Sequence, residues 1–354
     1  MVSSPLSLTD YRLLGRSGLS VSPMSLGTAG TFGLDTDVSR RMFDAYLDHG
    51  GNFIDTADIY ADGEAEARVG DYMRGKRENV IVGTKYSLGG RPGNPNSGGN
   101  SRRTMVRAVE ASLKRLGTDY TDIYYLHVWD GTTQPDEVMR GLDDLVRSGK
   151  VVYIGISDTP AWQVSRMQMM ADLRGWSPFV SLQIEYSLIQ RTVERDMVPM
   201  ARELDLGVTV WSPLGLGMLA GGYSRDDLRL VGRDDIGDPG TRRRGMNLRG
   251  RLTERIIDIA ERLAAVAKEL GASPAQTALA WVLSRPGVTA TPIGPRTWEQ
   301  FEDNLGALNL KLEPGQLAAL DEISKVSLDW PYEIMNEASV RAALLADSKQ
   351  RLRA

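Results

Sequence analysis

The stretch Asn52 to Tyr60, Asn-Phe-Ile-Asp-Thr-Ala-Asp-Ile-Tyr, begins as a buried strand and ends in polar residues. Two apolar residues follow a Gly-Gly break, so Asp55 stands where a strand leaves the core, and Tyr60 follows in the loop. Strand ends often carry an aspartate as a turn former or a helix cap, so this stretch alone is a modest signal. The pattern that surrounds it decides its meaning.

An apolar strand followed by a helix recurs along the whole chain. The expected strands, most of them rich in Val and Ile, are 24–27, 52–56, 80–85, 122–128, 151–157, 180–186, 208–214 and 288–293. The expected helices are 37–49, 64–73, 103–116, 135–147, 161–173, 193–206, 255–270, 274–283, 298–308 and 314–323. A short hairpin is expected at 11–21, and irregular structure at 215–251.

Continuous apolar strands that alternate with helices indicate a parallel α/β sheet covered by helices. Eight such units in 354 residues favour a closed (β/α)8 TIM barrel, with an N-terminal hairpin and extra C-terminal helices, over an open doubly wound sheet. No Gly-x-Gly-x-x-Gly opens a helix after an early strand, which weakens the open-sheet alternative. We expect one domain over 1–354, with a core at about 11–323 and an extension at 324–354.

Composition limits the classes of function. The chain is 42% hydrophobic and 25% charged, which is typical of a globular protein, and its formal charge of -4 is too small to indicate nucleic acid or an acidic membrane as a partner. The absence of cysteine excludes disulfides and thiolate chemistry, and with two histidines we predict no metal site. No signal peptide or bilayer-length apolar run is found, so we expect a cytoplasmic protein; monomer or homo-oligomer is left open.

In a barrel of this kind the active site lies where the strands end. Three consecutive strands deliver Asp55 with Tyr60, then Lys85, then His127, and we expect these four side chains to meet in one pocket. Further residues at strand ends are Ser157, Asp158, Gln183, Trp211, Ser212, Gly294 and Arg296. Taken singly, each residue also has a structural interpretation: Asp55 as a turn former, Lys85 as its ion-pair partner at the surface and Trp211 as a core residue. We expect no functional role for His49.

The four converging residues suit proton transfer to a carbonyl. A free tyrosine or lysine is a poor acid or base at neutral pH, but a buried ammonium is expected to lower the pKa of a neighbouring phenol. Asp55 would keep Lys85 charged, His127 would orient a carbonyl oxygen, and Tyr60 would deliver the proton. Since the chain shows no nucleophile motif, the carbonyl would receive a hydride from a cofactor.

The ordered motifs resemble those of the aldo-keto reductases over about 11–323. Besides the opening stretch they are Gly-Thr-Lys at 83–85, Leu-Gly-Thr-Asp-Tyr-Thr-Asp-Ile-Tyr-Tyr-Leu-His at 116–127, Gly-Lys-Val-Val-Tyr-Ile-Gly-Ile-Ser at 149–157, Leu-Gln-Ile-Glu-Tyr-Ser at 182–187, Trp-Ser-Pro-Leu at 211–214 and Ile-Gly-Pro-Arg-Thr at 293–297. This resemblance implies that Asp55, Tyr60, Lys85 and His127 form a catalytic tetrad with Tyr60 as proton donor.

The resemblance also implies a nicotinamide cofactor, NADP(H), extended over the mouth of the barrel. Its carboxamide would meet Ser157, Asp158 and Gln183, and its ring would stack on Trp211. The implied cofactor-binding residues are Thr28, Ser157, Asp158, Gln183, Trp211, Ser212, Pro213, Leu214, Gly215, Gly217, Gly294, Arg296, Thr297, Gln300, Asp303 and Asn304. Arg296 suits a 2′-phosphate, so NADPH is expected over NADH.

Two positions depart from many relatives. Asp158 stands where an Asn is common, so its contact with a carboxamide has to run through the amide NH2 group. Gly222 stands where a Lys that contacts the cofactor is common. Arginines downstream could replace that Lys: Arg225, Arg229, Arg233, Arg242, Arg243 and Arg244. The arginine cluster from Arg242 to Arg251 is equally compatible with a solvated loop and with a contact to the cofactor.

The substrate side is less specific. The Gly-, Pro- and Asn-rich loop 89–100 is either a plain connection or a lid, and Phe32 and Trp129 either line an apolar substrate pocket, the reading that we favour, or pack the loops. The first hypothesis is an NADPH-dependent reductase of an aromatic or sugar-like aldehyde or ketone. The second is an aryl-alcohol dehydrogenase or an enone or ketosugar reductase. The third is a nicotinamide-binding regulatory subunit that resembles the potassium-channel beta subunits.

Overall fold

The computed structural model describes residues 6–30, 32, 36–232, 250–327 and 329–345. The predicted positions Arg233, Arg242, Arg243 and Arg244 lie outside these residues.

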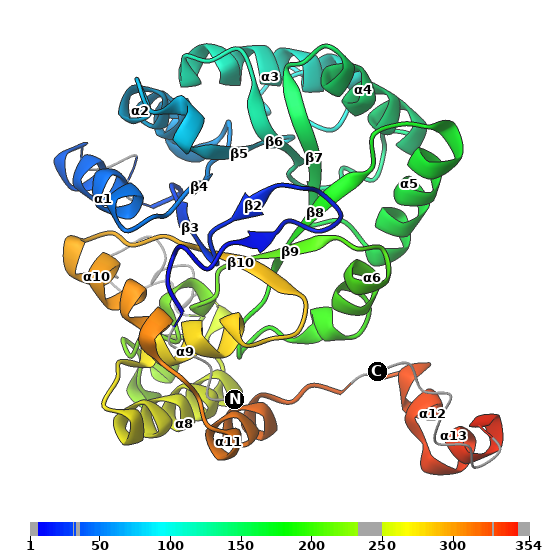
Figure 1. The fold of residues 1–354 in the computed structure, drawn as a ribbon. Coiled ribbons are helices and arrows are strands. Elements are labelled where there is room, and N and C mark those ends of the chain that lie inside the picture. Colours follow the sequence, from blue (N-terminus) through cyan, green and yellow to red (C-terminus); the bar gives the residue numbers. More distant parts are fainter. Residues whose placement is uncertain (1–5, 31, 33–35, 233–249, 328, 346–354) are drawn as a thin grey trace.

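Eight parallel strands close into a barrel, which confirms the predicted fold (Figure 1). They are β3 (Met24–Gly27), β4 (Phe53–Asp55), β5 (Ile81–Tyr86), β6 (Thr121–Leu126), β7 (Val151–Ser157), β8 (Phe179–Glu185), β9 (Gly207–Trp211) and β10 (Val288–Ile293). Each strand pairs with the next along the chain, and closure pairs Met24 of β3 with Thr291 of β10. All of the strand ends that carry the predicted site residues therefore lie at one end of the barrel.

Helices surround the barrel. They are α1 (Thr36–Asp48), α2 (Glu64–Tyr72), α3 (Arg102–Leu116), α4 (Pro135–Arg147), α5 (Ala161–Arg174), α6 (Met197–Glu203), α8 (Glu254–Leu270), α9 (Pro274–Leu283), α10 (Trp298–Gly306) and α11 (Pro314–Ser324). Local sequence sets several ends: Ser273 caps α9 in a capping box ahead of Pro274, and Gly117 ends α3 in a left-handed conformation.

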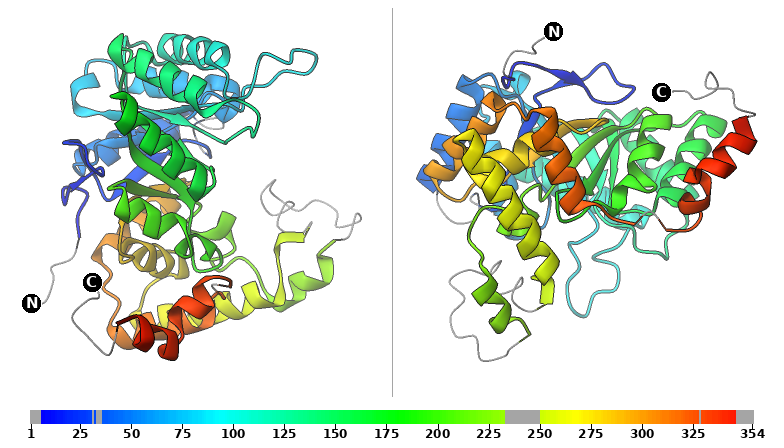
Figure 2. Two further views of the ribbon diagram at one scale, coloured as in Figure 1. Left: turned by 90° about the vertical axis from the view of Figure 1, so that its right-hand side faces the viewer. Right: turned by 90° about the horizontal axis from the view of Figure 1, so that it is seen from below.

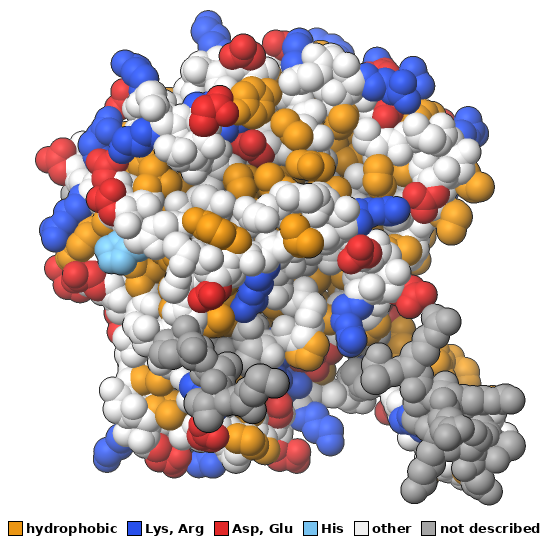
Figure 3. Space-filling view, in the orientation of Figure 1, with side chains coloured by type: hydrophobic (Ala, Val, Ile, Leu, Met, Phe, Trp, Pro, Cys, Tyr) orange, Lys and Arg blue, Asp and Glu red, His pale blue; other side chains and the backbone are white. Residues whose placement is uncertain are grey.

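The antiparallel hairpin of β1 (Arg12–Leu13) and β2 (Ser20–Val21) covers the end of the barrel where the strands begin. Leu14 and Val21 pack there against Phe53, Tyr125 and other inward-facing strand residues. On the face that carries the hairpin, charges of both signs are interspersed (Figure 3). The hairpin blocks this end, so access to the interior is from the opposite end.

Loops that project from that opposite end flank its mouth. Figure 2 shows the loop at 87–100 and the segment at 215–232 projecting on the side away from the hairpin. The second segment includes η5 (Gly215–Gly217) and η6 (Arg225–Leu230). Both segments therefore stand where a ligand would enter.

Two predicted elements are shorter than expected. The helix predicted at 193–206 is instead a turn, η4 (Thr192–Glu194), and the short α6, because Pro199 lacks an N–H and is tolerated only in the first turn of a helix. The strand predicted at 208–214 ends at Trp211, because Ser212 has a left-handed φ of 53° and Pro213 follows.

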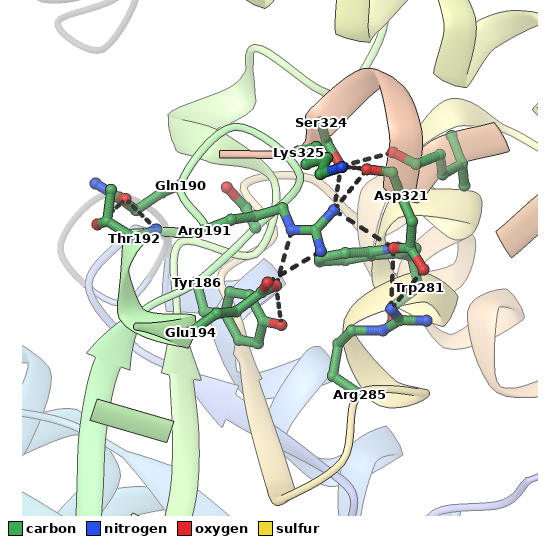
Figure 4. Close-up of polar contacts among 12 residues, drawn as sticks. Tyr186, Gln190, Arg191, Thr192, Glu194, Trp281, Arg285, Asp321, Ser324 and Lys325 are labelled. Carbon is green, nitrogen blue, oxygen red and sulfur yellow. Dashed lines mark hydrogen bonds and ion pairs between the residues drawn. The ribbon is translucent and has the colours of Figure 1, made fainter. Parts of the chain in front are cut away.

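A half-buried network of charges fastens α11 to the barrel (Figure 4). Arg191 donates to Glu194 at 2.8 and 3.0 Å and to the hydroxyl of Ser324 at 2.7 Å. We call this network the Arg191 cluster, and its residues are Tyr186, Arg191, Glu194, Trp281, Arg285, Asp321 and Ser324. Beyond it, α12 (Tyr332–Asn336) and α13 (Ala338–Leu345) form an arm on one side of the barrel in Figure 1.

Candidate active site

Lys85 is the centre of the polar cluster at the mouth of the barrel. Its side chain is completely buried, and its ammonium donates to Asp55 Oδ2 at 2.8 Å and to the carbonyl of Thr56 at 2.8 Å. It also donates to the hydroxyl of Tyr60 at 3.3 Å. Neighbouring strands β4 and β5 supply Asp55 and Lys85, so the parallel register holds the ion pair in place. A buried charge of this kind is tolerated only when it is paired and hydrogen-bonded.

Gln183 reaches the same cluster from β8 on the other side of the barrel. Its amide donates to the second oxygen of Asp55, Oδ1, at 2.8 Å. Sequence reasoning placed Gln183 at the mouth but did not foresee this bond, because no spacing rule connects residues 128 positions apart. The bond fixes the orientation of the carboxylate that accepts from Lys85.

His127 follows β6 directly and faces Tyr60. The two rings are edge to face, with centroids 6.0 Å apart. The Nδ1 atom of His127 is buried and has no partner among the described residues. Burial, together with the positive charge of Lys85, lowers the pKa of His127 to about 3. The imidazole is therefore neutral at pH 7, and it can donate from one nitrogen and accept at the other.

The protonation of Tyr60 differs from the expectation. Burial raises the pKa of Tyr60, and although Lys85 acts in the opposite direction, the net shift is upward. The prediction of a lowered tyrosine pKa was therefore wrong for the protein without a ligand, because desolvation outweighs the neighbouring ammonium. Burial also acts to lower the pKa of Lys85, but Asp55 and Tyr60 outweigh it and the net shift is upward. Both groups hold their protons at neutral pH.

A cavity of about 650 Å³ opens above this cluster. Tyr60, His127 and Asp55 line its inner end, whereas Lys85 lies beneath them. Thirteen of the predicted cofactor residues also line it: Ser157, Asp158, Gln183, Trp211, Ser212, Pro213, Leu214, Gly217, Gly294, Arg296, Gln300, Asp303 and Asn304. The strand-end rule thus gathers residues from all parts of the barrel around one cavity.

Five other predicted residues lie near the cavity but are not among the residues that line it. The amide of Thr28 donates to the carbonyl of Asp55, Gly215 opens η5, and Thr297 caps α10. Phe32 is buried and packs against Tyr72, and the half-buried Trp129 packs against the large core cluster. A contact of Phe32 or Trp129 with substrate stays a prediction.

The lining also includes residues that sequence reasoning missed. Gly27 and Ala29 follow β3, Pro292, Ile293 and Pro295 lie at the end of β10, and Ala275 and Leu279 come from α9. The loop after β9 adds Leu216, Ala220 and Tyr223. Gly222, a position already noted from the sequence, lines the cavity as well. The strand ends of β3 and β10 were a usable signal, but small apolar residues carry no chemical signature of a binding role.

Unpaired buried polar atoms border the cavity. Ser157 Oγ and His127 Nδ1 are buried, and neither has a partner among the described residues. Buried polar groups are nearly always hydrogen-bonded, so atoms of this kind mark places where a ligand or water completes the bonding. The indole nitrogen of Trp211 does have a partner, since it donates to Asp158 Oδ1 at 3.0 Å.

The outer end of the cavity suits a negatively charged group. Arg296 lies ahead of α10, and its amide donates to Gln300 at 2.8 Å, while the hydroxyl of Thr297 caps the helix. A helix N-terminus beside an arginine is a favourable environment for a phosphate. Ser273 donates to Asp303 at 2.8 Å and so fixes that carboxylate against α9.

The described residues contain no group of three or more His, Cys, Asp or Glu side chains placed to hold a metal ion. Within the same residues, no helix has the length and apolar character needed to cross a membrane.

The fold and the site define a TIM-barrel protein with an Asp, a Tyr, a Lys and a His around one deep cavity. A family model described as "Aldo/keto reductase family" matches residues 23–325. The chain belongs to the aldo/keto reductase family.

Curated relatives cover nearly the whole chain. An aryl-alcohol dehydrogenase (NADP+) of Phanerodontia chrysosporium is 35% identical, over 95% of this chain and 91% of that protein. An uncharacterized oxidoreductase of Bacillus subtilis, YrpG, is 38% identical, over 89% of this chain and 95% of that protein. A norsolorinic acid reductase of Aspergillus flavus is 33% identical, over 96% of this chain and 87% of that protein. These names support an oxidoreductase.

Proposed function

We propose that this protein is an NADPH-dependent reductase that converts an aldehyde or ketone with an aromatic or sugar-like body to the alcohol. The observation that carries the proposal is the 3.3 Å contact between the buried ammonium of Lys85 and the hydroxyl of Tyr60 at the inner end of the cavity. This contact places a protonated phenol, backed by a fixed positive charge, where a ligand in the cavity would meet it.

The residues present fit a nicotinamide cofactor. Ser157 has an unpaired hydroxyl, Asp158 presents a carboxylate and Trp211 an indole at the inner end, and Arg296 lies at the outer end beside the start of α10. A bound NADPH would supply the hydride. The proposed cofactor residues are those named from the sequence, and Arg296 is proposed to favour the 2′-phosphate. We also propose that 1–354 is a single domain.

Each member of the tetrad has a separate task in the proposed reaction. Tyr60 donates its proton to the carbonyl oxygen as the carbonyl carbon accepts the hydride. Lys85 stabilises the phenolate that Tyr60 becomes, and Asp55, held by Gln183, keeps Lys85 in position. Neutral His127 donates a hydrogen bond to the same carbonyl oxygen and so orients the substrate.

Replacing the tyrosine tests this proposal. With a panel of aromatic aldehydes and ketosugars, Tyr60→Phe is expected to lower kcat for NADPH oxidation by about 10²–10⁴-fold, because the general acid is lost. NADPH affinity and Tm are expected to stay unchanged, since the ring remains. Equal rates in the two proteins would remove Tyr60 from the mechanism. Tight NADPH binding without turnover of any carbonyl would favour the regulatory-subunit alternative.

Alcohol oxidation is the second candidate, because the relative from Phanerodontia chrysosporium is named an aryl-alcohol dehydrogenase (NADP+). The same tetrad serves that direction if Tyr60 accepts the proton that it otherwise donates. Product analysis with benzylic alcohols and NADP+, alongside the aldehyde panel with NADPH, distinguishes the preferred direction.

A further inference from the structure

Asp158 places a carboxylate in a fixed position at the inner end of the cavity. Its Oδ1 atom accepts the indole N–H of Trp211 at 3.0 Å, and its backbone has a φ of 32°, in the left-handed region. Asp, Asn and Gly adopt this region more readily than other residues. Its backbone carbonyl also accepts from the amide of Trp129 at 3.4 Å. Backbone and side chain are therefore both held.

The negative charge of Asp158 acts on the neighbouring site. Burial raises its pKa, while the bond from Trp211 and the charge of Lys85 act to lower it by stabilising the ionised form. In turn, Asp158 contributes to the raised pKa of Tyr60. Asp158 and Tyr60 line the same cavity, so a ligand that contacts Tyr60 at this end lies within the field of Asp158.

The following step rests on the proposed function. Hydride and proton add to the two adjacent atoms of one C=O bond, so the nicotinamide ring must lie within a few ångström of the carbonyl that Tyr60 protonates. This requirement would place the ring beside Tyr60, in a cavity that Asp158 and Trp211 also line. Asp158 lies near enough to Tyr60 for its charge to act on the pKa of Tyr60. The ring is neutral in NADPH and carries a positive charge in NADP+.

We propose that Asp158 is a specificity-determining residue that makes this protein prefer the oxidised cofactor, because its carboxylate attracts the cationic ring of NADP+ and not the neutral ring of NADPH. In the reductive direction Tyr60 would give its proton to the carbonyl oxygen and a bound NADPH would supply the hydride to the carbonyl carbon, so the cofactor left beside Asp158 would be the cation NADP+. The same attraction that favours this step slows the release of NADP+.

Asp158→Asn isolates the charge. The asparagine oxygen still accepts the bond from Trp211, and asparagine tolerates the left-handed backbone. Isothermal titration calorimetry at pH 8 measures the Kd of NADP+ and of NADPH for both proteins. We expect NADP+ binding to weaken about tenfold in the variant and NADPH binding to change less than about twofold. A tenfold effect corresponds to one close charge pair whose effective dielectric lies between the values for bulk water and for a protein surface, because the Asp158 side chain is exposed.

Glu185→Gln provides the matched control. Glu185 ends β8, next to Trp211 in the sheet register, and Arg251 and Asp158 both act on its pKa, which burial raises. It is not among the residues that line the cavity. Removing its charge is expected to leave the ratio of the two dissociation constants unchanged.

The outcomes separate this inference from the proposed function. Equal weakening of NADP+ and NADPH, or no change in either, overturns the role of the Asp158 charge while leaving the reductase proposal intact. Binding of neither cofactor to the native protein overturns both. If Asp158→Asn is unstable, Asp158→Gly, which suits a left-handed backbone best, is expected to lose the same preference for NADP+.

Discussion

Two networks of charge in this protein differ in how completely they are bonded. In the Arg191 cluster, Arg191, Glu194, Asp321 and the rings around them pair with one another, and none of their side-chain atoms is left buried without a partner. Around Lys85 the ion pair is complete, but His127 Nδ1 and Ser157 Oγ have no partner among the described residues. A complete network holds elements together, whereas an incomplete one leaves bonding capacity for a ligand.

Replacing Lys85 is expected to have the largest effect on activity, because it removes the centre of the second network. Lys85→Met is expected to lower kcat for carbonyl reduction about 10³-fold or more, because Tyr60 loses the charge that stabilises its phenolate. Steady-state kinetics with NADPH and an aromatic aldehyde measure the change. A kcat within tenfold of the native value would contradict the role of Lys85, and far-ultraviolet circular dichroism serves as the control for folding.

Breaking the Arg191 cluster should affect stability and not catalysis. Arg191→Met leaves the half-buried Glu194 without its cation and removes the donor to the buried Ser324 hydroxyl. The free energy of unfolding is expected to fall by about 1–3 kcal/mol. Urea titration followed by tryptophan fluorescence measures the loss. The kcat of the folded fraction is expected to be unchanged.

Arg195→Met is the matched control, because the ion pair of Arg195 with Asp329 lies nearer the surface. A loss of less than about 1 kcal/mol is expected there. Equal losses in the two variants would show that the Arg191 cluster has no special weight.

Asp58 sharpens the comparison, because one oxygen of its carboxylate is unpaired and it is not among the residues that line the cavity. Its Oδ1 atom is buried without a partner, and burial, with a further contribution from Glu66, raises its pKa to about 7. Since the folded pKa exceeds the unfolded value of 3.8, its stabilising contribution is complete at low pH and is lost as the pH rises through 7. Asp58→Asn should therefore raise Tm by a few degrees at pH 8 and by less at pH 5.

Differential scanning calorimetry at the two pH values tests this expectation. Glu66→Gln is the control, because Glu66 accepts from Arg115 at 2.7 Å and from Thr84, so its replacement should lower Tm. A lower Tm for Asp58→Asn at pH 8 would contradict this expectation and would show that both oxygens of the ionised Asp58 carboxylate have hydrogen-bond partners.

Local sequence predicted most of the fold because the elements carry their own signals. The bounds of α4, α9, β7 and β10 agree with the prediction to the residue. Pro is the first residue of α4 and of α9, and Gly stands on both sides of β10. The prediction of one helix at 193–206 was wrong, because the hydrophobic pattern continues across Pro199 but proline has no N–H to bond in a helix interior. The helix therefore begins only at Met197, which puts Pro199 in the first turn.

The site was predictable as a set of residues but not as a set of bonds. The strand-end rule found Asp55, Lys85, His127 and Gln183, because parallel strands end at the same face of a barrel. The bond from Gln183 to Asp55 and the bond from Trp211 to Asp158 each depend on side-chain reach across the barrel mouth. The pKa of Tyr60 was predicted in the wrong direction, because the depth of burial is not written in local sequence.

The closure of the barrel between β3 and β10 also determines when the cavity can exist. Its lining begins at Gly27 and ends at Asn304, so the first and last strands must pair before its walls are continuous. During synthesis the chain grows from its N-terminus, and Lys85 has left the ribosome long before Arg296 is made. A nascent chain that stops short of α10 therefore carries the tetrad without the part of the cavity wall that α10 supplies, and the site is completed only after α10 has been made.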